Sequence, residues 1–592
     1  MAVQAITSLF IGSKQITNFK SYTLDQYIND HHVLEVVCRM DVLDQLGESL
    51  ANSSKNFLGQ SISLEVVSNN IFENYQPLQF KGVVAKIASR RGMNDKNEVV
   101  ITAYSPTIIS DDGAHYSSYC EASLDVIVSE SLQEYDRSKL STTIQPQNTT
   151  PLLYSVQHNE SNWQYVSRLA RQYGEWLYYN GQELIFGTPK DGSELTLTQG
   201  KDLYSFSIEL LPLPNQFNFF TGDYVSDTFH EKKSNEIATG ANGYNSFASN
   251  VSQNLYTKET RVWVNQVDSA EQRAQLDNQV ELRKKAIEQQ QFSIEGESNN
   301  PGVMLGRKIN IIAEGLGEGN YRITKVRHFN NSNGNYQNTF EAISTQLDIF
   351  PDTNMMAFPK SESQIAVVTD NADPEGLSRI KVQFAWQQQD GETTSWLRML
   401  TPHSGGEKGF HFIPEIGEEV LVGFEGGNAE RPYVMGALYN GSKNAGGWQS
   451  SSNDIKAIRT RSGHTIELND ADGAESITIT DKNSNILIID TANNNIEITA
   501  GETMTLNAKN IEINASEEIN IKAGTNMITK VTEDHSLSSK NNTVTSEENT
   551  TVIAKEILEN ADKVRIESAK ENMELVSSKM VDVQANDKIK LF

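Results

Sequence analysis

The last fifth of the chain, from Ile477 to Leu591, repeats a short pattern of β-forming residues. Two apolar residues with one residue between them recur about every eight positions, and a repeat of this kind constrains the fold more than any other feature. The clearest pairs are Ile477/Ile479, Ile486/Ile488, Ile496/Ile498, Met504/Leu506, Ile511/Ile513, Ile519/Ile521, Val564/Ile566, Met573/Leu575, Val581/Val583 and Ile589/Leu591. The residues between the pairs are mostly Asn, Asp, Ala, Gly, Lys and Glu, which suit turns.

Alternation of apolar and polar residues indicates a strand with one buried face. A strand and turn of about eight residues cannot close a turn of a β-helix, which needs roughly twenty residues. We therefore expect three chains, each forming one side of a triangular prism, although a monomeric β-solenoid of three strands per turn and a β-rich tail remain alternatives. The residues expected to fill the axis of this prism include Ile488, Ile498, Leu506, Ile513, Ile521, Ile566 and Leu575.

Composition limits the partners of the chain. The 592 residues are enough for several domains. A net charge of -27 disfavours nucleic acid and anionic membrane surfaces.

The two cysteines, Cys38 and Cys120, do not form a disulfide framework and are expected to be reduced. The first residues lack the features of a signal peptide, so we expect synthesis in the cytoplasm and export by another route.

The first 150 residues are expected to be mostly strands, among them Leu34 to Cys38, Ile62 to Val66 and Val99 to Tyr104. Asp41 is positioned to cap an amphipathic helix that carries leucines at 43, 46 and 50. The segment from Pro146 to Pro151 is typical of a linker.

Two helices and a hairpin are expected in the next 200 residues. Ser161 and Gln164 form a capping box at the start of a helix that Gly174 ends. The dipeptide Asn180-Gly181 then predicts a two-residue hairpin turn. A longer helix runs from about Ser269 to Gln290 with an apolar stripe. The apolar stripe consists of Leu276, Val280 and Ile287.

Residues 365–440 are expected to form five or six short strands. Ile380, Val382 and Phe384 alternate along one of them, and Val420 and Val422 along another. A segment of this length and pattern fits a small closed barrel such as an OB-fold.

Several segments carry motifs that occur together in one protein family. The helix from Asn159 to Ala170 is similar to a helix of the VgrG spike proteins of type VI secretion systems. The strand from Gly376 to Trp386 and the segments from Ser395 to Met399, Phe412 to Asn440 and Arg461 to His464 follow in the order that the family shows. The resemblance spans nearly the whole chain, and the run from Phe412 to Asn440 is specific.

The resemblance implies a mainly β fold with four parts: a hub β-barrel domain with residues 1–150, a second hub region with helices and a β-barrel in 151–355, an OB-fold collar in 356–445 and a needle in 446–592. We call these parts the hub, the collar and the needle. The needle would be an intertwined trimeric β-helix, or β-prism. The chain would act as the spike of a contractile injection machine, which caps the tube and baseplate and pierces a target membrane to deliver effectors.

The resemblance also implies partners: two further copies in a homotrimer, an Hcp-like tail tube, baseplate proteins, a PAAR-like tip protein and the effectors. The membrane contact would be transient, and no nucleic acid is expected. We expect the tip protein to bind an apolar platform of Ile589, Leu591 and Phe592. A phage-like or extracellular injection particle is the alternative, and a glycan-binding tailspike is less favoured.

No residue pattern points to catalysis. Gly315 to Gly319 lacks the Lys-Ser/Thr of a phosphate-binding loop and is expected to be a turn. The histidine pairs His31/His32 and His403/His411 have no further ligands at suitable spacing. A hydrolase insert between collar and needle and a C-terminal effector domain are both expected to be absent. We therefore expect no catalytic, cofactor-binding or metal-binding residues, and no enzyme activity.

Overall fold

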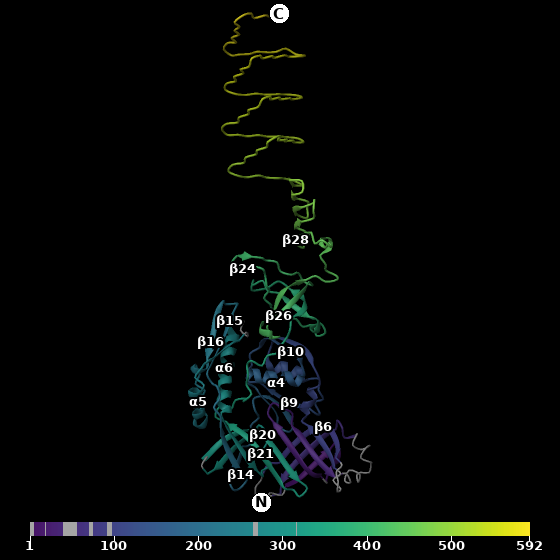
Figure 1. Cartoon of the computed structure of the whole chain (residues 1–592), viewed down its shortest axis with the longest axis vertical. Helices are drawn as coiled ribbons and strands as arrows, with labels where there is room; N and C mark the ends of the chain where they lie inside the picture. The colour runs from purple at the N-terminus through teal and green to yellow at the C-terminus, as the bar shows by residue number, and fades with distance from the viewer. Residues whose placement is uncertain are drawn as a thin grey trace. The chain divides into compact units, whose positions relative to one another are not determined.

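The computed structural model describes residues 5–17, 19–39, 56–69, 75–90, 98–264, 270–314 and 317–591. The chain divides into two compact units, Met1–Lys482 with Ile486–Ile498, and Asn483–Asn485 with Thr499–Phe592 (Figure 1). The helix expected after Asp41 lies outside the described residues, and so do Leu316 in the expected turn and Phe592 at the expected tip.

A thirteen-stranded sheet forms the end of the first unit that holds the N-terminus (Figure 1). Its order is β14-β18-β21-β20-β3-β4-β7-β6-β5-β1-β2, with β13 and β19 joined to it through β20. Strand β20 pairs with β3, so strands from both sides of residue 150 share one sheet. The strands are β1 (Ala5–Ile11), β2 (Lys14–Gln15), β3 (Phe19–Tyr27), β4 (Val33–Arg39), β5 (Ser61–Ser68), β6 (Leu78–Arg90), β7 (Glu98–Tyr104), β13 (Leu195–Thr198), β14 (Leu203–Leu210), β18 (Phe292–Ser298), β19 (Lys308–Ala313), β20 (Gly317–Asn331) and β21 (Tyr336–Ser344).

A buried polar chain crosses the core of this sheet. The amide nitrogen of Gln26 donates to Nδ1 of His32 at 3.0 Å, and the amide oxygen accepts from Nε2 of His328 at 3.1 Å. The hydroxyl of Tyr336 donates to Nδ1 of His328 at 2.6 Å. Burial lowers the pKa of both histidines to about 3, so both rings are neutral near pH 7.

A layer of short strands and two helices covers the sheet. It contains β8 (His115–Ala122), α3 (Leu124–Leu132), β9 (Ser141–Gln145), β10 (Leu152–Glu160), α4 (Asn162–Tyr173), β11 (Trp176–Tyr179) and β12 (Glu183–Gly187). The capping box at Ser161 and Gln164 is present, and Gly174 ends α4 in the left-handed conformation, as expected. The hairpin is also present, but its turn is centred one residue later, because Asn180 pairs with Glu183 and Gly181 takes the positive φ.

Residues 217–290 form a separate module on one side of this layer. It consists of β15 (Phe217–Asp223), β16 (Thr228–Lys233), α5 (Gly243–Leu255), β17 (Thr260–Trp263) and α6 (Ala270–Gln290). The expected stripe of α6 is buried: Leu276, Val280 and Ile287 pack in one cluster with Phe217 and Phe219.

The collar is a small closed barrel, as the sequence predicts. Four strands pair in the order β23-β22-β26-β27, and they are β22 (Gln364–Asp370), β23 (Lys381–Phe384), β26 (Glu419–Phe424) and β27 (Pro432–Leu438). The segment 397–399 closes the barrel, because Leu397 pairs with Ile380 and Met399 with Val434. Two short strands, β24 (Ser404–Gly405) and β25 (Lys408–Gly409), form a hairpin outside it.

The first part of the needle forms a sheet within one chain. The sequence had predicted that each chain contributes one strand to each layer of a three-chain prism. Strands β28 (Ile455–Arg459), β29 (Thr465–Asn469), β30 (Ser476–Thr480), β31 (Ile486–Asp490) and β32 (Asn495–Thr499) lie in sequence order in one sheet. The turns explain this difference, because Gly463, Gly473, Ser484 and Asn494 have positive φ and allow the chain to reverse. Beyond Asn494 no described residue has positive φ, so no such reversal follows.

Candidate functional sites: the hub–collar junction and the needle

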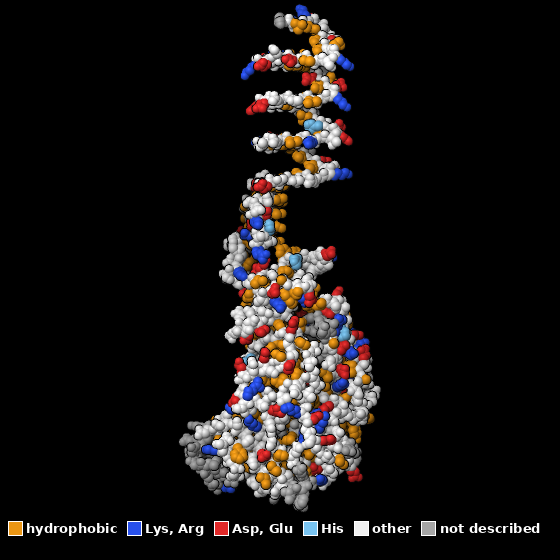
Figure 2. All heavy atoms as spheres, turned by 180° about the vertical axis from the view of Figure 1, so that it is seen from behind, with side chains coloured by type: hydrophobic (Ala, Val, Ile, Leu, Met, Phe, Trp, Pro, Cys, Tyr) orange, Lys and Arg blue, Asp and Glu red, His pale blue; other side chains and the backbone are white. Residues whose placement is uncertain are grey.

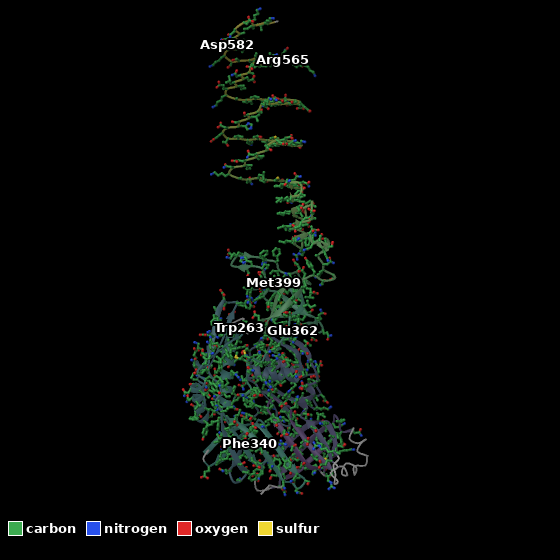
Figure 3. The ribbon with its side chains drawn as sticks, in the orientation of Figure 1. Trp263, Phe340, Glu362, Met399, Arg565 and Asp582 are labelled. Atoms are coloured by element: carbon green, nitrogen blue, oxygen red, sulfur yellow. The ribbon has the colours of Figure 1, made fainter. Side chains whose placement is uncertain are left out.

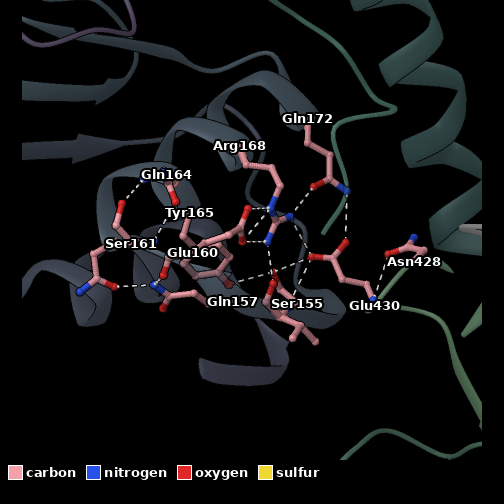
Figure 4. Close-up of polar contacts among 12 residues, drawn as sticks. Ser155, Gln157, Glu160, Ser161, Gln164, Tyr165, Arg168, Gln172, Asn428 and Glu430 are labelled. Atoms are coloured by element: carbon pink, nitrogen blue, oxygen red, sulfur yellow. Dashed lines mark hydrogen bonds and ion pairs between the residues drawn. The ribbon is translucent and has the colours of Figure 1, made fainter. Parts of the chain in front are cut away.

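A buried ion network joins the hub to the collar (Figure 4). Arg168 projects from α4 and lies between two carboxylates, Glu160 at the end of β10 and Glu430 in the loop between β26 and β27. Its Nε and Nη2 donate to Glu160 at 2.8 and 3.0 Å, and its Nη1 donates to Glu430 at 3.2 Å. Hub and collar segments 262 residues apart in sequence therefore meet in one charged cluster.

Further hydrogen bonds provide partners for the polar atoms of the network that are shielded from water. The Glu430 side chain also accepts from Ser155 Oγ at 3.2 Å and from Gln172 Nε2 at 3.3 Å. The side chains of Arg168 and Glu430 are only 8% and 7% exposed. Burial opposes the charged form of Arg168, but the carboxylates of Glu430 and Glu160 raise its pKa above the ordinary value. Arg168 is therefore charged at every physiological pH.

A second contact between hub and collar lies beside the network. Trp386 of the collar packs against Tyr154, Val156 and Ala429, and its Nε1 donates to Gln364 at 3.0 Å. The neighbouring Gln387 donates from Nε2 to Ser118 of the hub at 2.7 Å. Arg168 and Trp386 lie in two of the motifs that resemble the VgrG family, but no sequence pattern pairs them across the junction. Glu430 was not predicted as a site residue, and its only signal in the sequence is a carboxylate in the loop between two expected core strands.

The predicted needle core is not buried within one chain. Every described residue from Asn493 to Leu591 is exposed, whereas Ile488 on β31 is half-buried. The exposed fractions lie between 53% and 68% for Ile498, Leu506, Ile513, Ile521, Ile566 and Leu575. Of the residues expected at the tip, Ile589 is 52% and Leu591 91% exposed.

The backbone beyond Gly501 is an open coil. Figure 2 shows open space between its successive turns, and Figure 3 shows side chains such as those of Arg565 and Asp582 standing on separate turns. Among the described residues from Gly501 to Leu591, no backbone–backbone hydrogen bond forms. Bends recur about every eight residues, for example at 516–517, 524–525, 532–533 and 547–548, so the period continues through the segment where the apolar pattern is weak.

The residues considered above as possible reactive or metal-binding groups pack against other parts of the chain. Burial raises the pKa of the Cys38 thiol to about 12 and that of Cys120 to about 11. His31 contacts Thr107 through Nδ1 at 2.8 Å and lies against the ring of Trp163. In the described part of the chain, no group of three or more His, Cys, Asp or Glu residues is arranged to hold a metal ion. Within the same residues, no helix is both long and apolar enough to cross a bilayer.

Comparisons with known proteins agree with this architecture. Residues 29–209 match the phage tail baseplate hub family, and residues 364–439 match the type VI secretion system/phage-baseplate injector OB domain. The spike protein VgrG5 of Pseudomonas aeruginosa is 29% identical over 191 residues, which cover 28% of this chain and 24% of that protein. VgrG1c of the same organism is 31% identical over 140 residues, covering 22% and 18%. The chain therefore spans no more than about a quarter of the length of these relatives.

A solved structure described as the Francisella PdpA-VgrG complex, lidded, has the same fold. It superimposes with a TM-score of 0.55 over 84% of this chain and 80% of that chain, at 10% identity. A baseplate hub followed by an injector OB barrel defines the spike class of contractile injection machines. Within that class, the chain is similar to the VgrG spike proteins, as its motifs suggested. The two matching families are a baseplate hub and an injector OB domain, which are structural parts of such machines.

Proposed function

We propose that this chain forms the homotrimeric spike of a type VI secretion machine, which caps the tube and baseplate and delivers effectors into a target cell. The observation that carries the proposal is the needle segment beyond Gly501, which combines a regular period with exposed apolar residues and, among its described residues, no backbone–backbone hydrogen bond. Backbone N–H and C=O groups form hydrogen bonds in stable folds, and a row of exposed apolar side chains favours association.

Two further copies would supply what one chain lacks. Strands in a sheet lie about 4.8 Å apart, and unpaired turns must stand farther apart than that. Strands of two other chains would occupy the space between successive turns, pair with the free backbone and bury Ile513, Ile521 and their equivalents on a common axis. A charged residue at an axial position would bury three like charges together, which is costly. The repeated positions are apolar, as this arrangement requires.

Sedimentation of the purified full-length chain tests the trimer. We expect a single species of three times the chain mass of 66.0 kDa at micromolar concentration. A folded monomer with an intact β-sheet signal would refute the proposal. A single chain that buries its apolar needle residues by itself needs no further copies.

We also propose the finer organisation of the spike. Residues 1–150 and 151–355 would supply the two hub domains that meet an Hcp-like tube and the baseplate, 356–445 the collar, and 446–592 the needle. Assembly would occur in the cytoplasm, and the spike would then be injected across the target membrane, with no nucleic acid involved. The shared sheet through β20 and β3 supports two hub domains that act as one rigid body.

The tip is proposed to bind a small PAAR-like protein that carries effectors. Three copies of Ile589, Leu591 and Phe592 would form an apolar end face, and exposed strand ends of this kind normally need covering. Co-purification with the neighbouring tip protein tests this. Removing Lys588 to Phe592 should leave the trimer intact and abolish capture, whereas equal recovery with both chains would place the partner elsewhere.

The spike is proposed to have no catalytic activity of its own. Peptidoglycan and lipid hydrolysis by the pure protein should equal the buffer control. Turnover that scales with protein concentration and survives repurification would refute this statement.

A further inference from the structure

Arg307, in the loop that leads into β19, is a buried cation without a carboxylate partner. Four arginines are buried in the described part of the chain, and Arg168, Arg322 and Arg379 each form an ion pair with a carboxylate. Arg307 is 7% exposed and forms no ion pair with any described residue. Burial lowers the pKa of Arg307, whereas in the other three the hydrogen bonds and charges of carboxylates outweigh burial and raise the pKa. A charge buried in this way is costly unless an opposite charge reaches it.

The guanidinium of Arg307 hydrogen-bonds only to uncharged oxygen atoms. Its Nη1 donates to the carbonyl of Gly302 at 3.0 Å, and its Nε and Nη2 donate to the carbonyl of Ser193 at 3.3 and 2.8 Å. Nη2 also donates to the hydroxyl oxygen of Ser193 at 3.2 Å. An arginine has five N–H groups, so at least one donor and the whole positive charge remain available to a ligand.

Arg307 lines a pocket of about 300 Å³ in the hub, which lies between β6, the β11–β12 hairpin and the loop that leads into β19. This volume is at the small end of the range for ligand pockets. None of the side chains that line it carries a carboxylate, although the whole chain has a net charge of -27. The other cation of the pocket, Lys190, is exposed and already pairs with Glu183 at 2.7 Å, so the uncompensated charge is that of Arg307.

Carboxamide side chains make up much of the remaining wall. They are Gln76, Gln79, Asn180 and Gln182, of which Gln76 and Gln182 are exposed to solvent. A carboxamide both donates and accepts hydrogen bonds, so it can pair with the N–H and C=O groups of a peptide. Gly306 lies so close to the ring of Tyr178 that a Cβ at this position would come within 2.2 Å of it. The loop and the hairpin therefore pack directly against each other at the wall of the pocket.

We propose that this pocket binds the carboxylate of an acidic side chain that a partner protein presents to the hub. The single uncompensated charge of Arg307 matches the single charge of a carboxylate, and a guanidinium forms strong charge-assisted hydrogen bonds with it. The carboxamides would pair with the peptide groups on either side of the acidic residue. All of these residues lie in the hub of one chain, so the inference does not depend on the trimer or the needle.

Saturation-transfer NMR with the full-length protein tests the site. The probe is the blocked peptide acetyl-Gly-Asp-Gly-amide at millimolar concentration, and acetyl-Gly-Asn-Gly-amide is the matched probe without the charge. We expect saturation transfer to the aspartate peptide and about tenfold weaker binding, or less, of the asparagine peptide. A lack of saturation transfer to the aspartate peptide, or equal binding of both peptides, would overturn the proposal.

Substitutions show whether the peptide binds in this pocket. Arg307→Gln should weaken binding of the aspartate peptide by about tenfold or more, because the opposite charge is lost. Gln182→Glu provides a second test if Arg307→Gln does not fold, since it adds a carboxylate at an exposed lining residue and should repel the peptide. Gln133→Glu is the matched control, because Gln133 is exposed after α3 and does not line the pocket. Equal binding by the Gln182→Glu and Gln133→Glu proteins would place the peptide elsewhere and refute the site.

Competition identifies the source of the bound charge. Acetate should displace the aspartate peptide only at higher concentration than the peptide itself requires, because it lacks the flanking peptide groups. Acetate that binds as tightly as the peptide would indicate a site for a free organic acid and overturn the protein partner. Inorganic phosphate that binds more tightly than both would overturn the assignment to a carboxylate.

Discussion

Replacing Arg168 by methionine tests whether the hub and the collar are held together by the buried ion network. Methionine keeps an unbranched side chain of similar length but supplies no hydrogen-bond donor. The substitution leaves the buried carboxyl group of Glu430 without its cation, while Glu160, whose side chain is 17% exposed, turns more readily toward water.

The expected cost follows from this burial. Removing one partner of a buried ion pair destabilises a protein by about 3–5 kcal/mol, because the other charge stays buried. Each 1.4 kcal/mol is a factor of about ten in an equilibrium constant. Local opening of the junction should therefore become between about a hundredfold and several thousandfold more frequent. Adding Glu430→Gln removes the uncompensated charge and should recover a large part of the loss.

Native-state hydrogen exchange measures this opening where it occurs. Amide protection should fall in α4 and in the loop around Glu430, and remain unchanged in the thirteen-stranded sheet. Arg171→Met is the matched control, since Arg171 lies exposed on the same helix and outside the network, and it should change protection by less than about threefold. Unchanged protection with Arg168→Met would show that the network does not hold the junction.

Three further predictions concern other parts of the chain. Ile513→Asp should prevent trimer formation in sedimentation velocity, because three carboxylates would meet on the needle axis, whereas Glu512→Gln should have no effect; a stable Ile513→Asp trimer would refute the proposed register. Burial lowers the pKa of His32 and His328 to about 3, so below pH 6.5 the unfolded state binds more protons than the folded state. The free energy of unfolding should therefore fall by about 1.4 kcal/mol per pH unit for each histidine as the pH drops toward 3. Thermal melts between pH 7 and 4.5 should show this loss, and His328→Gln should reduce its slope by about half if the variant folds; an unaltered slope would locate the acid sensitivity elsewhere. Burial raises the pKa of Cys38 to about 12, so its thiol should resist maleimide at pH 8 until the hub unfolds, and rapid labelling of the native protein would contradict its buried placement.

Local patterns in the sequence predicted much of the fold, because local interactions form these elements. The capping residues Ser161 and Gly174 bound α4, and the alternation at Ile380, Val382 and Phe384 predicted a collar strand with one buried face. The same kind of signal could have shown where the needle stops pairing with itself. Gly463, Gly473 and Asn494 sit in reversals, and the repeats beyond them lack left-handed turns.

The tertiary structure alone decided which distant segments meet. The pairing of β20 with β3 joins strands from both sides of the expected boundary at residue 150. Nothing in the sequence of either strand identifies the other as its partner. Arg168 and Glu430 are likewise ordinary charged residues until folding buries them together. Apolar periodicity predicts which face of an element is buried, because removing apolar side chains from water is favourable wherever they lie in the chain. Partner choice depends on shape and charge across a packed interface, and these exist only once the chain has folded.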